Sequence, residues 1–117
     1  MVMTRVKTGV VRRRRHKKRI AQTKGFRGLR SKIFTQANIA WMKAGLHAYV
    51  GRKKKKRDYR QLWIARISAA LKLNGTLKYS RFIKALADNK ISLNRKVLAD
   101  LALNHPQAFD AVVNKVS

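Results

Sequence analysis

The sequence predicts an all-α protein with a long, basic helical extension at its amino-terminal end and a small helical bundle at its carboxyl-terminal end. Apolar residues recur at the three- and four-residue spacing of helices, and no stretch alternates with period two for long enough to indicate a sheet. Pro106 is the only proline, so no proline interrupts the first 105 residues. Residues 1–60 hold 21 Lys and Arg and one acid, whereas residues 61–117 hold nine and three. We therefore expect a basic extension over 1–60, which includes the start of a long helix, and a globular helical domain over 61–117.

The composition excludes several classes of protein. The chain of 117 residues carries a formal charge of +26 and has no cysteine, which excludes disulfides, thiolate zinc sites and cysteine nucleophiles. Its apolar runs are a few residues long, whereas a membrane-spanning helix needs about 20. Val10-Val11 is followed by Arg12 to Arg15 rather than by the apolar core of a secretory signal, and the first serine, Ser31, comes too late for a typical transit peptide. We expect an intracellular protein that works where it is made, or one already trimmed.

Residues 1–24 carry ten Lys and Arg around a few valines and Ile20. Such a segment buries too little apolar surface to offset an ordering cost of about 1–2 kcal/mol per residue. We expect it to be disordered when alone in water. It is either a solvated basic tail or a segment that orders against a polyanion, and the high charge density without acids favours the second interpretation.

The sequence Gly25-Phe26-Arg27-Gly28 predicts a sharp bend, because glycine tolerates backbone conformations that other residues avoid. A long helix is expected from about residue 29 to about residue 73. At about 1.5 Å per residue it would be about 65–70 Å long, so it would protrude or bend at Gly45 or Gly51. Packing against a neighbour is favoured over stacking on bases for its apolar stripe, which comprises Ile33, Phe34, Ala37, Trp41, Ala44 and Ala48.

The run from Arg52 to Arg57 consists of six consecutive cations. Successive helical residues advance by about 100°, so these side chains point around the whole circumference of a helix. A helix that reads a DNA groove, or lies on a membrane, needs an apolar face that this run lacks. The run fits the interior of a folded RNA, with a solvated charge block as the alternative. Asp58 lies one helical turn from Lys54 and Lys55, where it is expected to orient cations rather than to act chemically.

Tyr59, Arg60 and Trp63 follow this run and could extend an RNA-binding surface through stacking and phosphate contacts. Trp63 could equally be the first core residue of the following domain. Both interpretations stand at this point.

Residues 61–117 predict a small bundle of helices. Asn74-Gly75 ends the long helix, Asp88-Asn89 ends the next, Ser92 or Asn94 caps a third, and Pro106 suits the first turn of the last. The predicted core stripes are Leu62, Trp63, Ile64, Ile67, Ala70 and Leu71; Tyr79, Phe82, Ile83 and Leu86; Val97, Leu98 and Leu101; and Phe109, Val112, Val113 and Val116. About 57 residues give a thin but viable core. Arg81, Lys84, Lys90, Arg95 and Lys96 form either an ordinary solvated face or a second RNA contact.

Catalytic and cofactor chemistry is not expected. The three histidines, His16, His47 and His105, have no nearby carboxylate pair, no metal-ligand spacing and no nucleophile partner. The glycines at 25 and 28 lack the strand–loop–helix setting of a nucleotide-binding loop. We predict no enzyme, no cofactor and no metal site, and we interpret His16 as a further phosphate-facing group.

The candidate RNA-binding residues are cations of the extension, with one histidine and two aromatic residues. They are Arg5, Lys7, Arg12, Arg13, Arg14, Arg15, His16, Lys17, Lys18, Arg19, Lys24, Arg27, Arg30, Lys32, Arg52, Lys53, Lys54, Lys55, Lys56, Arg57, Tyr59, Arg60 and Trp63. Two rival classes share the charge. A DNA-compacting nucleoid protein would need a one-sided basic face or a dimer symmetry, and a cationic membrane-active protein would need an amphipathic helix; neither pattern is found.

Five motifs occur in a characteristic order. They are MTRVKTGVVRRRRHKK at residues 3–18, KGFRG at 24–28 followed by RSK at 30–32, KRDYR at 56–60 followed by LWI at 62–64, YSRF at 79–82 and LNRKVLA at 93–99. Together they make residues 3–117 resemble bacterial-type large-subunit ribosomal protein twenty.

The resemblance implies an all-helical ribosomal protein without enzymatic activity. Its basic extension would be embedded in large-subunit rRNA, which it would bind early in subunit assembly, and its small helical domain would follow. It also implies ribosomal protein twenty-one as a typical neighbour and, in some bacteria, binding of the protein's own messenger RNA to repress translation. The expected location is the large ribosomal subunit, in a bacterial cytoplasm or in an organelle such as the plastid.

Overall fold

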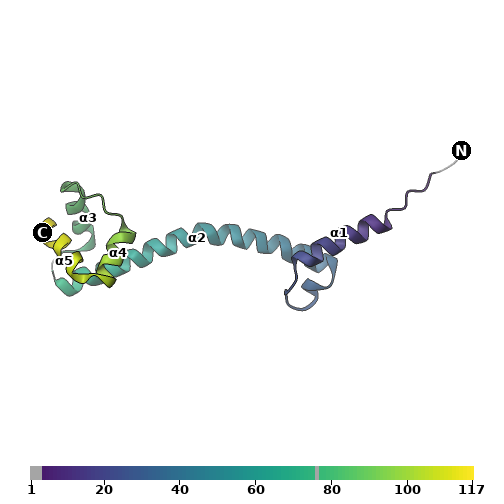
Figure 1. Ribbon diagram of the computed structural model, residues 1–117, viewed down its shortest axis with the longest axis horizontal. Helices are drawn as coiled ribbons and strands as arrows, with labels where there is room; N and C mark the ends of the chain where they lie inside the picture. The colour runs from purple at the N-terminus through teal and green to yellow at the C-terminus, as the bar shows by residue number, and fades with distance from the viewer. Residues whose placement is uncertain (1–3, 76) are drawn as a thin grey trace. The chain divides into compact units, whose positions relative to one another are not determined.

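The structure, a computed structural model, describes residues 4–75 and 77–117, and its regular elements are helices joined by short connections (Figure 1). Its elements are α1 (Gly9–Gln22), the short 3-10 helix η1 (Gly28–Ser31), α2 (Phe34–Asn74), α3 (Tyr79–Asp88), α4 (Arg95–Asn104) and α5 (Pro106–Val116). The described residues contain no strand, which confirms the all-α prediction. Met3, the first residue of the characteristic motifs, lies outside the described residues.

The chain divides into two compact units, Met1–Arg52 and Lys53–Ser117, so the division falls within α2. The first unit contains α1, η1 and the first part of α2; the second contains the remainder of α2 with α3, α4 and α5. The division predicted between residues 60 and 61 is of another kind: it separates a part that binds RNA from a part that folds alone, and it stays a prediction.

Helix α1 is a surface helix without a fully buried residue. Arg and Lys are good helix formers, so the basic run from Arg12 to Arg19 is compatible with a helix once part of it has a surface to lie on. The expectation that residues 1–24 are disordered concerns the isolated segment in water and stays a prediction.

The bend after α1 is confirmed at Gly25 and Gly28, whose φ angles of 86° and 66° lie in the left-handed region that favours glycine. Thr23 is fully buried in the turn, where its Oγ1 donates a hydrogen bond of 3.0 Å to the Ile20 carbonyl and its own carbonyl accepts from the Phe26 amide at 3.1 Å. The chain then forms η1 before α2 begins at Phe34. The predicted helix start at about residue 29 was therefore wrong, because the left-handed Gly28 leads into a separate 3-10 turn first.

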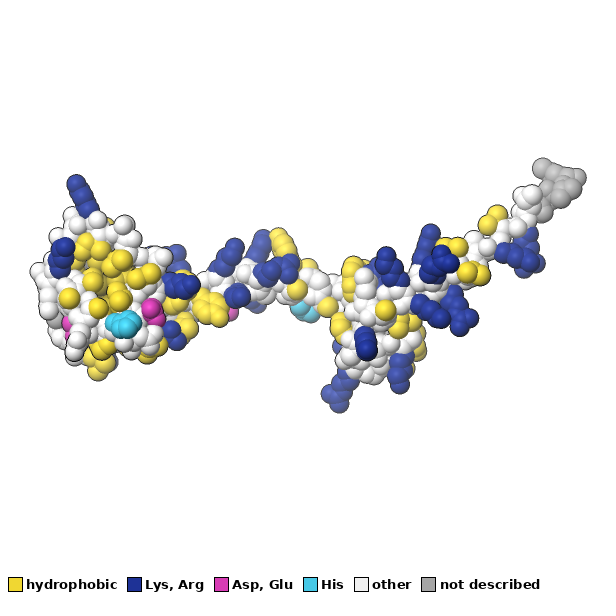
Figure 2. Space-filling model, in the orientation of Figure 1, with side chains coloured by type: hydrophobic (Ala, Val, Ile, Leu, Met, Phe, Trp, Pro, Cys, Tyr) yellow, Lys and Arg dark blue, Asp and Glu magenta, His cyan; other side chains and the backbone are white. Residues whose placement is uncertain are grey.

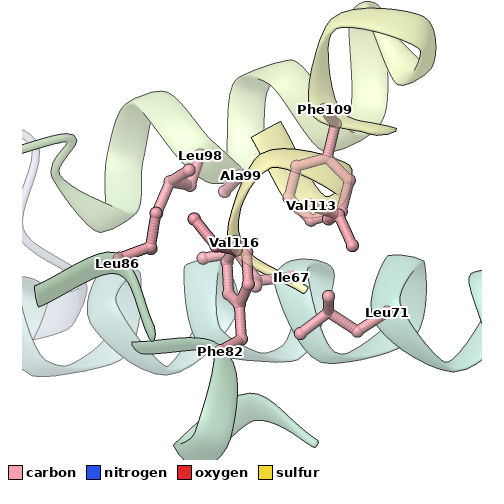
Figure 3. Close-up of a cluster of buried hydrophobic side chains, with 9 residues drawn as sticks. All are labelled: Ile67, Leu71, Phe82, Leu86, Leu98, Ala99, Phe109, Val113 and Val116. Atoms are coloured by element: carbon pink, nitrogen blue, oxygen red, sulfur yellow. The ribbon is translucent and has the colours of Figure 1, made fainter. Parts of the chain in front are cut away.

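The second unit packs α3, α4 and α5 around the carboxyl-terminal end of α2 (Figure 3). The Phe82 and Phe109 rings meet at the centre with centroids 5.8 Å apart, an edge-tilted arrangement that suits aromatic pairs. The buried cluster comprises Ile67, Leu71, Phe82, Leu86, Leu98, Ala99, Phe109, Val113 and Val116. All four predicted stripes supply residues to this cluster. Leu62 and Val97, by contrast, are each 41% exposed, so their predicted places in the core were wrong. Each is rotated by about 100° from a neighbour, Trp63 or Leu98, that packs in or against the core.

Polar contacts fix the helix ends of the second unit. Asn94 caps α4 by accepting a hydrogen bond of 2.9 Å from the Val97 amide, which identifies the cap that the sequence left open between residues 92 and 94. Pro106 opens α5 as predicted, and α2 ends at Asn74. Arg95 donates through Nε to the Tyr79 hydroxyl at 2.7 Å, which connects α3 to α4.

Candidate nucleic-acid interface

The candidate RNA-binding residues are almost all on the surface. Of the 23, only His16, Arg19 and Trp63 are half-buried, and the other 20 are exposed. Figure 2 shows Lys and Arg side chains standing out from α1 and along α2. Exposed cations are able to reach phosphate groups without any rearrangement of a core, so the surface meets the first requirement of an RNA-binding site.

Helix α1 has one face turned toward the start of α2. The His16 ring stacks on Phe34, with centroids 3.9 Å apart and an interplanar angle of 10°. One turn later, the Arg19 guanidinium lies 3.8 Å from the centre of the Trp41 ring and donates to Gln22 Oε1 at 3.3 Å. These contacts connect α1 to α2, and the charge pattern did not predict them. The predicted packing of the stripe is confirmed for Phe34 and for Ala37, which is fully buried, whereas Ile33, Ala44 and Ala48 are exposed.

The two faces of α1 are expected to contribute differently to RNA binding. Arg14 is exposed and lies on the helix face away from His16 and Arg19, so Arg14→Gln should reduce the slope of log affinity against log salt by about 0.7–0.9, the loss of one phosphate contact. Arg19→Gln removes the same charge but also a cation–π contact. It should lower affinity about threefold with a smaller change in slope, because such a contact stabilises by about 0.5–1 kcal/mol at exposed sites. Salt titrations of both variants against a folded RNA check this, and equal slopes for the two would contradict the assignment.

The cations at residues 53–57 are successive exposed residues of α2 in the second unit, and Arg52, the last residue of the first unit, is exposed too. Because each residue is rotated by about 100° from the one before, residues 53–57 present positive charge around the helix. A flat surface or a single groove would contact only part of this charge. The arrangement suits a polyanion that approaches the helix from several directions.

Tyr59 and Trp63 lie one turn apart on α2, with ring centroids 6.2 Å apart. Trp63 is half-buried and packs against the core cluster of the second unit, which confirms its interpretation as a core residue. Tyr59 is exposed. An RNA contact by either residue stays a prediction.

A surface hollow in the first unit was not predicted from the sequence. It lies between the turn after α1 and one face of α2, and its lining includes Phe26, Arg30, Ala40 and Lys43. The sequence gives little indication of this hollow. Its α2 lining residues share a helix face but do not form an apolar stripe: they include Gln36, Ala40, Lys43 and His47. Phe26 comes from a different segment, and the turn brings it to that face.

The described part of the chain contains neither a candidate metal site nor a candidate membrane-spanning helix. Within residues 4–75 and 77–117, no three His, Cys, Asp or Glu side chains are grouped so that they could hold a metal ion. None of the helices in these ranges combines the length and the apolar character that a membrane crossing requires.

Comparison with known proteins decides the family. The model of the family described as "Ribosomal protein L20" matches residues 5–112. The chain belongs to the L20 family. Bacterial relatives named "Large ribosomal subunit protein bL20" extend the match: the protein of Alkaliphilus metalliredigens is 54% identical over 111 residues, 95% of this chain and 92% of the relative. That of Marinobacter nauticus is 54% identical over 113 residues, 97% of this chain and 96% of the relative, and that of Leptospira biflexa is 52% identical over the same length.

Membership of the L20 family confirms the resemblance inferred from the five motifs. It makes this L20 protein a structural constituent of the large ribosomal subunit, and not an enzyme. Its partners are accordingly components of the ribosome.

Proposed function

We propose that this L20 family member binds large-subunit rRNA directly through residues 1–60 and supports an early step of subunit assembly. Residues 61–117 would act as a preformed docking module. The observation that carries the proposal is the exposure of 20 of the 23 candidate residues, in a segment whose first acid is Asp58. Every cation that meets a phosphate releases counterions, which favours binding and makes it strongly dependent on salt.

The folding of the extension would be coupled to RNA binding. Over residues 4–52, the described part of the first unit, only Thr23 and Ala37 are fully buried, so apolar burial contributes little to its stability. Surrounding phosphates would remove the repulsion among its cations, and the helices would become stable as the RNA folds around them. A slender helical extension can occupy the space between RNA helices because it has no globular bulk.

The family resemblance supports finer assignments, which we include in the proposal. The neighbouring protein would be ribosomal protein twenty-one, and the protein's own messenger RNA would be a second ligand. The particle would be a ribosome of the bacterial cytoplasm or of an organelle, and the bacterial relatives favour the first.

Ultraviolet crosslinking of large subunits purified from the protein's own cells tests direct binding. Mass spectrometry of the crosslinked peptides and sequencing of the RNA fragments should connect residues 5–60 to large-subunit rRNA. Crosslinks to other proteins alone would contradict the proposal. Competition with random duplex DNA tests the nucleoid alternative, which requires equal affinity for the two nucleic acids.

Reconstitution tests the early role. Adding the protein only after the other large-subunit proteins have bound should leave inactive particles, whereas adding it first should restore activity. Equal activity of the particles from both orders of addition would contradict the early role in assembly and leave only the proposal of direct rRNA binding.

Coupled folding predicts different behaviour for the two halves of the chain. Residues 61–117 alone should show a cooperative helical melt, because they contain the whole buried cluster. Residues 1–60 alone should look disordered by circular dichroism at ordinary salt, because they have a net charge of +20 and little apolar burial. A stable helix in isolated residues 1–60 would contradict coupled folding.

A further inference from the structure

The hollow beside the turn after α1 has an apolar wall and cationic groups together. Phe26, Ile39, Ala40 and Ala44 supply the apolar surface, and Arg30 and Lys43 also line it. We propose that this hollow holds one unpaired nucleotide of large-subunit rRNA, with its base against the apolar wall and its phosphates beside the two cations. The inference rests on the proposed function and names the RNA feature that this part of the surface recognises.

The shape of the wall suits a flat ring. Ala40 and Ala44 lie one turn apart on α2 and have small side chains, which leaves space above the helix surface. Phe26 borders this space from the turn, and Ile39, which is 49% exposed, borders it from α2. Unpaired bases bind proteins by stacking on aromatic and apolar side chains, and such stacking tolerates any base.

The hollow is separate from the contacts that hold the first unit together. Phe34 and Trp41 contact α1 and do not line the hollow, and Gln36 and Lys43 lie about half a turn away from them on α2. Ala44 lies nearer to their face, but beyond Trp41 along the helix. A ligand could therefore enter without displacing α1. Gln36 and His47 also line the hollow and provide hydrogen-bonding groups for the edge of a base.

Charge decides the class of occupant. Residues 1–52 contain 15 Lys and Arg and no acid, so a second copy of this unit would be repelled and an anionic partner is favoured. A free phosphate would leave the apolar wall uncovered, and a base inside a duplex is stacked and cannot offer its face. An unpaired nucleotide has both an apolar plane and adjoining negative charges. An acidic protein segment with an aromatic residue is the alternative that the experiment must exclude.

The test fills the hollow without changing any charge. Ala44→Leu adds bulk in the hollow, and Ala48→Leu makes the same change at an exposed position of α2 outside its lining. The full-length proteins are titrated with an RNA hairpin that carries one bulged 2-aminopurine and with the same hairpin without the bulge. Fluorescence of the 2-aminopurine reports its stacking.

Ala44→Leu should weaken binding of the bulged hairpin about tenfold, which corresponds to about 1.4 kcal/mol, because the stacking of one base is lost. It should also abolish the change in 2-aminopurine fluorescence. The unbulged hairpin should bind Ala44→Leu as tightly as it binds the wild type, because it places no base in the hollow. Ala48→Leu should behave as the wild type with both probes. Equal affinity of the two variants for the bulged hairpin, or an equal loss with both hairpins, would overturn the inference.

A photocrosslinker in the intact particle separates RNA from protein as the occupant. p-Benzoylphenylalanine at position 39 should crosslink to large-subunit rRNA in purified subunits, and a crosslink to a protein segment instead would overturn the inference. If Ala44→Leu has no effect on the bulged hairpin while the wild type prefers large-subunit rRNA over duplex DNA, only this inference fails. If the wild type shows no such preference, the proposed function fails.

Discussion

Replacing Lys54, Lys55 and Lys56 together by glutamine is expected to lower the affinity for large-subunit rRNA about hundredfold at ordinary salt. Each charged contact is worth about 1 kcal/mol or more, and about 3 kcal/mol corresponds to a factor of about a hundred. The slope of log affinity against log salt should fall by about 2–3, because three phosphates are no longer neutralised. The effect is large because these side chains leave α2 in three different directions, so no one phosphate serves all three.

The matched control replaces Lys72, Lys78 and Lys115 by glutamine. These three lysines are exposed and lie outside the candidate RNA-binding residues, and their loss changes the net charge by the same amount. Filter binding over a series of salt concentrations should show less than a threefold loss of affinity for the control. Equal losses for the two triple variants would mean that only net charge matters and that residues 52–57 have no special role.

The second large effect concerns the core of the carboxyl-terminal bundle. Leu98→Ala should lower the free energy of unfolding by about 2–5 kcal/mol, because truncation of a fully buried leucine removes apolar contacts and leaves a cavity. A domain of this size has a stability of only about 3–9 kcal/mol. The variant should therefore lose much or all of its cooperative melt, together with the docking function proposed for residues 61–117.

Leu103→Ala is the control in the same helix. Leu98 is 0% exposed and Leu103 is 60% exposed, so the same substitution at residue 103 should change stability by less than about 0.5 kcal/mol. Urea denaturation of the full-length variants, followed by circular dichroism, measures the difference. Similar midpoints for the two variants would contradict the packing described for α4.

The fold of the carboxyl-terminal bundle could be predicted because local and tertiary signals agree there. Phe82 and Leu86 recur at helical spacing and are both buried, Asn94 caps the following helix, and Pro106 opens the last. Leu62 and Val97 were assigned to the core wrongly, because spacing alone does not show which of two neighbouring apolar residues faces inward.

The first unit could be predicted only in part. Its glycine turn was foreseen, since Gly25 and Gly28 are local signals. The packing of His16 and Arg19 on α2 was not, because a helix with cations at most positions has no apolar periodicity that identifies its inner face. The hollow was not predicted for a related reason. Its lining comes from the turn after α1 and from α2, and no local sequence pattern shows that these two segments lie together.

The candidate RNA-binding residues were predicted mainly from their charge. The sequence identified the cations that lie exposed on α1 and α2, because a run without interspersed acids has few alternative roles. It could not distinguish an arginine that faces phosphate from one that lies on an aromatic ring. Arg19 shows the difference, since its guanidinium is over Trp41.

Lysine acetylation of intact large subunits tests the central claim, that RNA surrounds the basic part of α2. Lys54, Lys55 and Lys56 point in different directions around the helix, so RNA on one side would protect only some of them. Quantitative mass spectrometry should find all three much less reactive in the particle than in the extracted protein. Reactivity in the intact particle equal to that in the extracted protein would contradict the account.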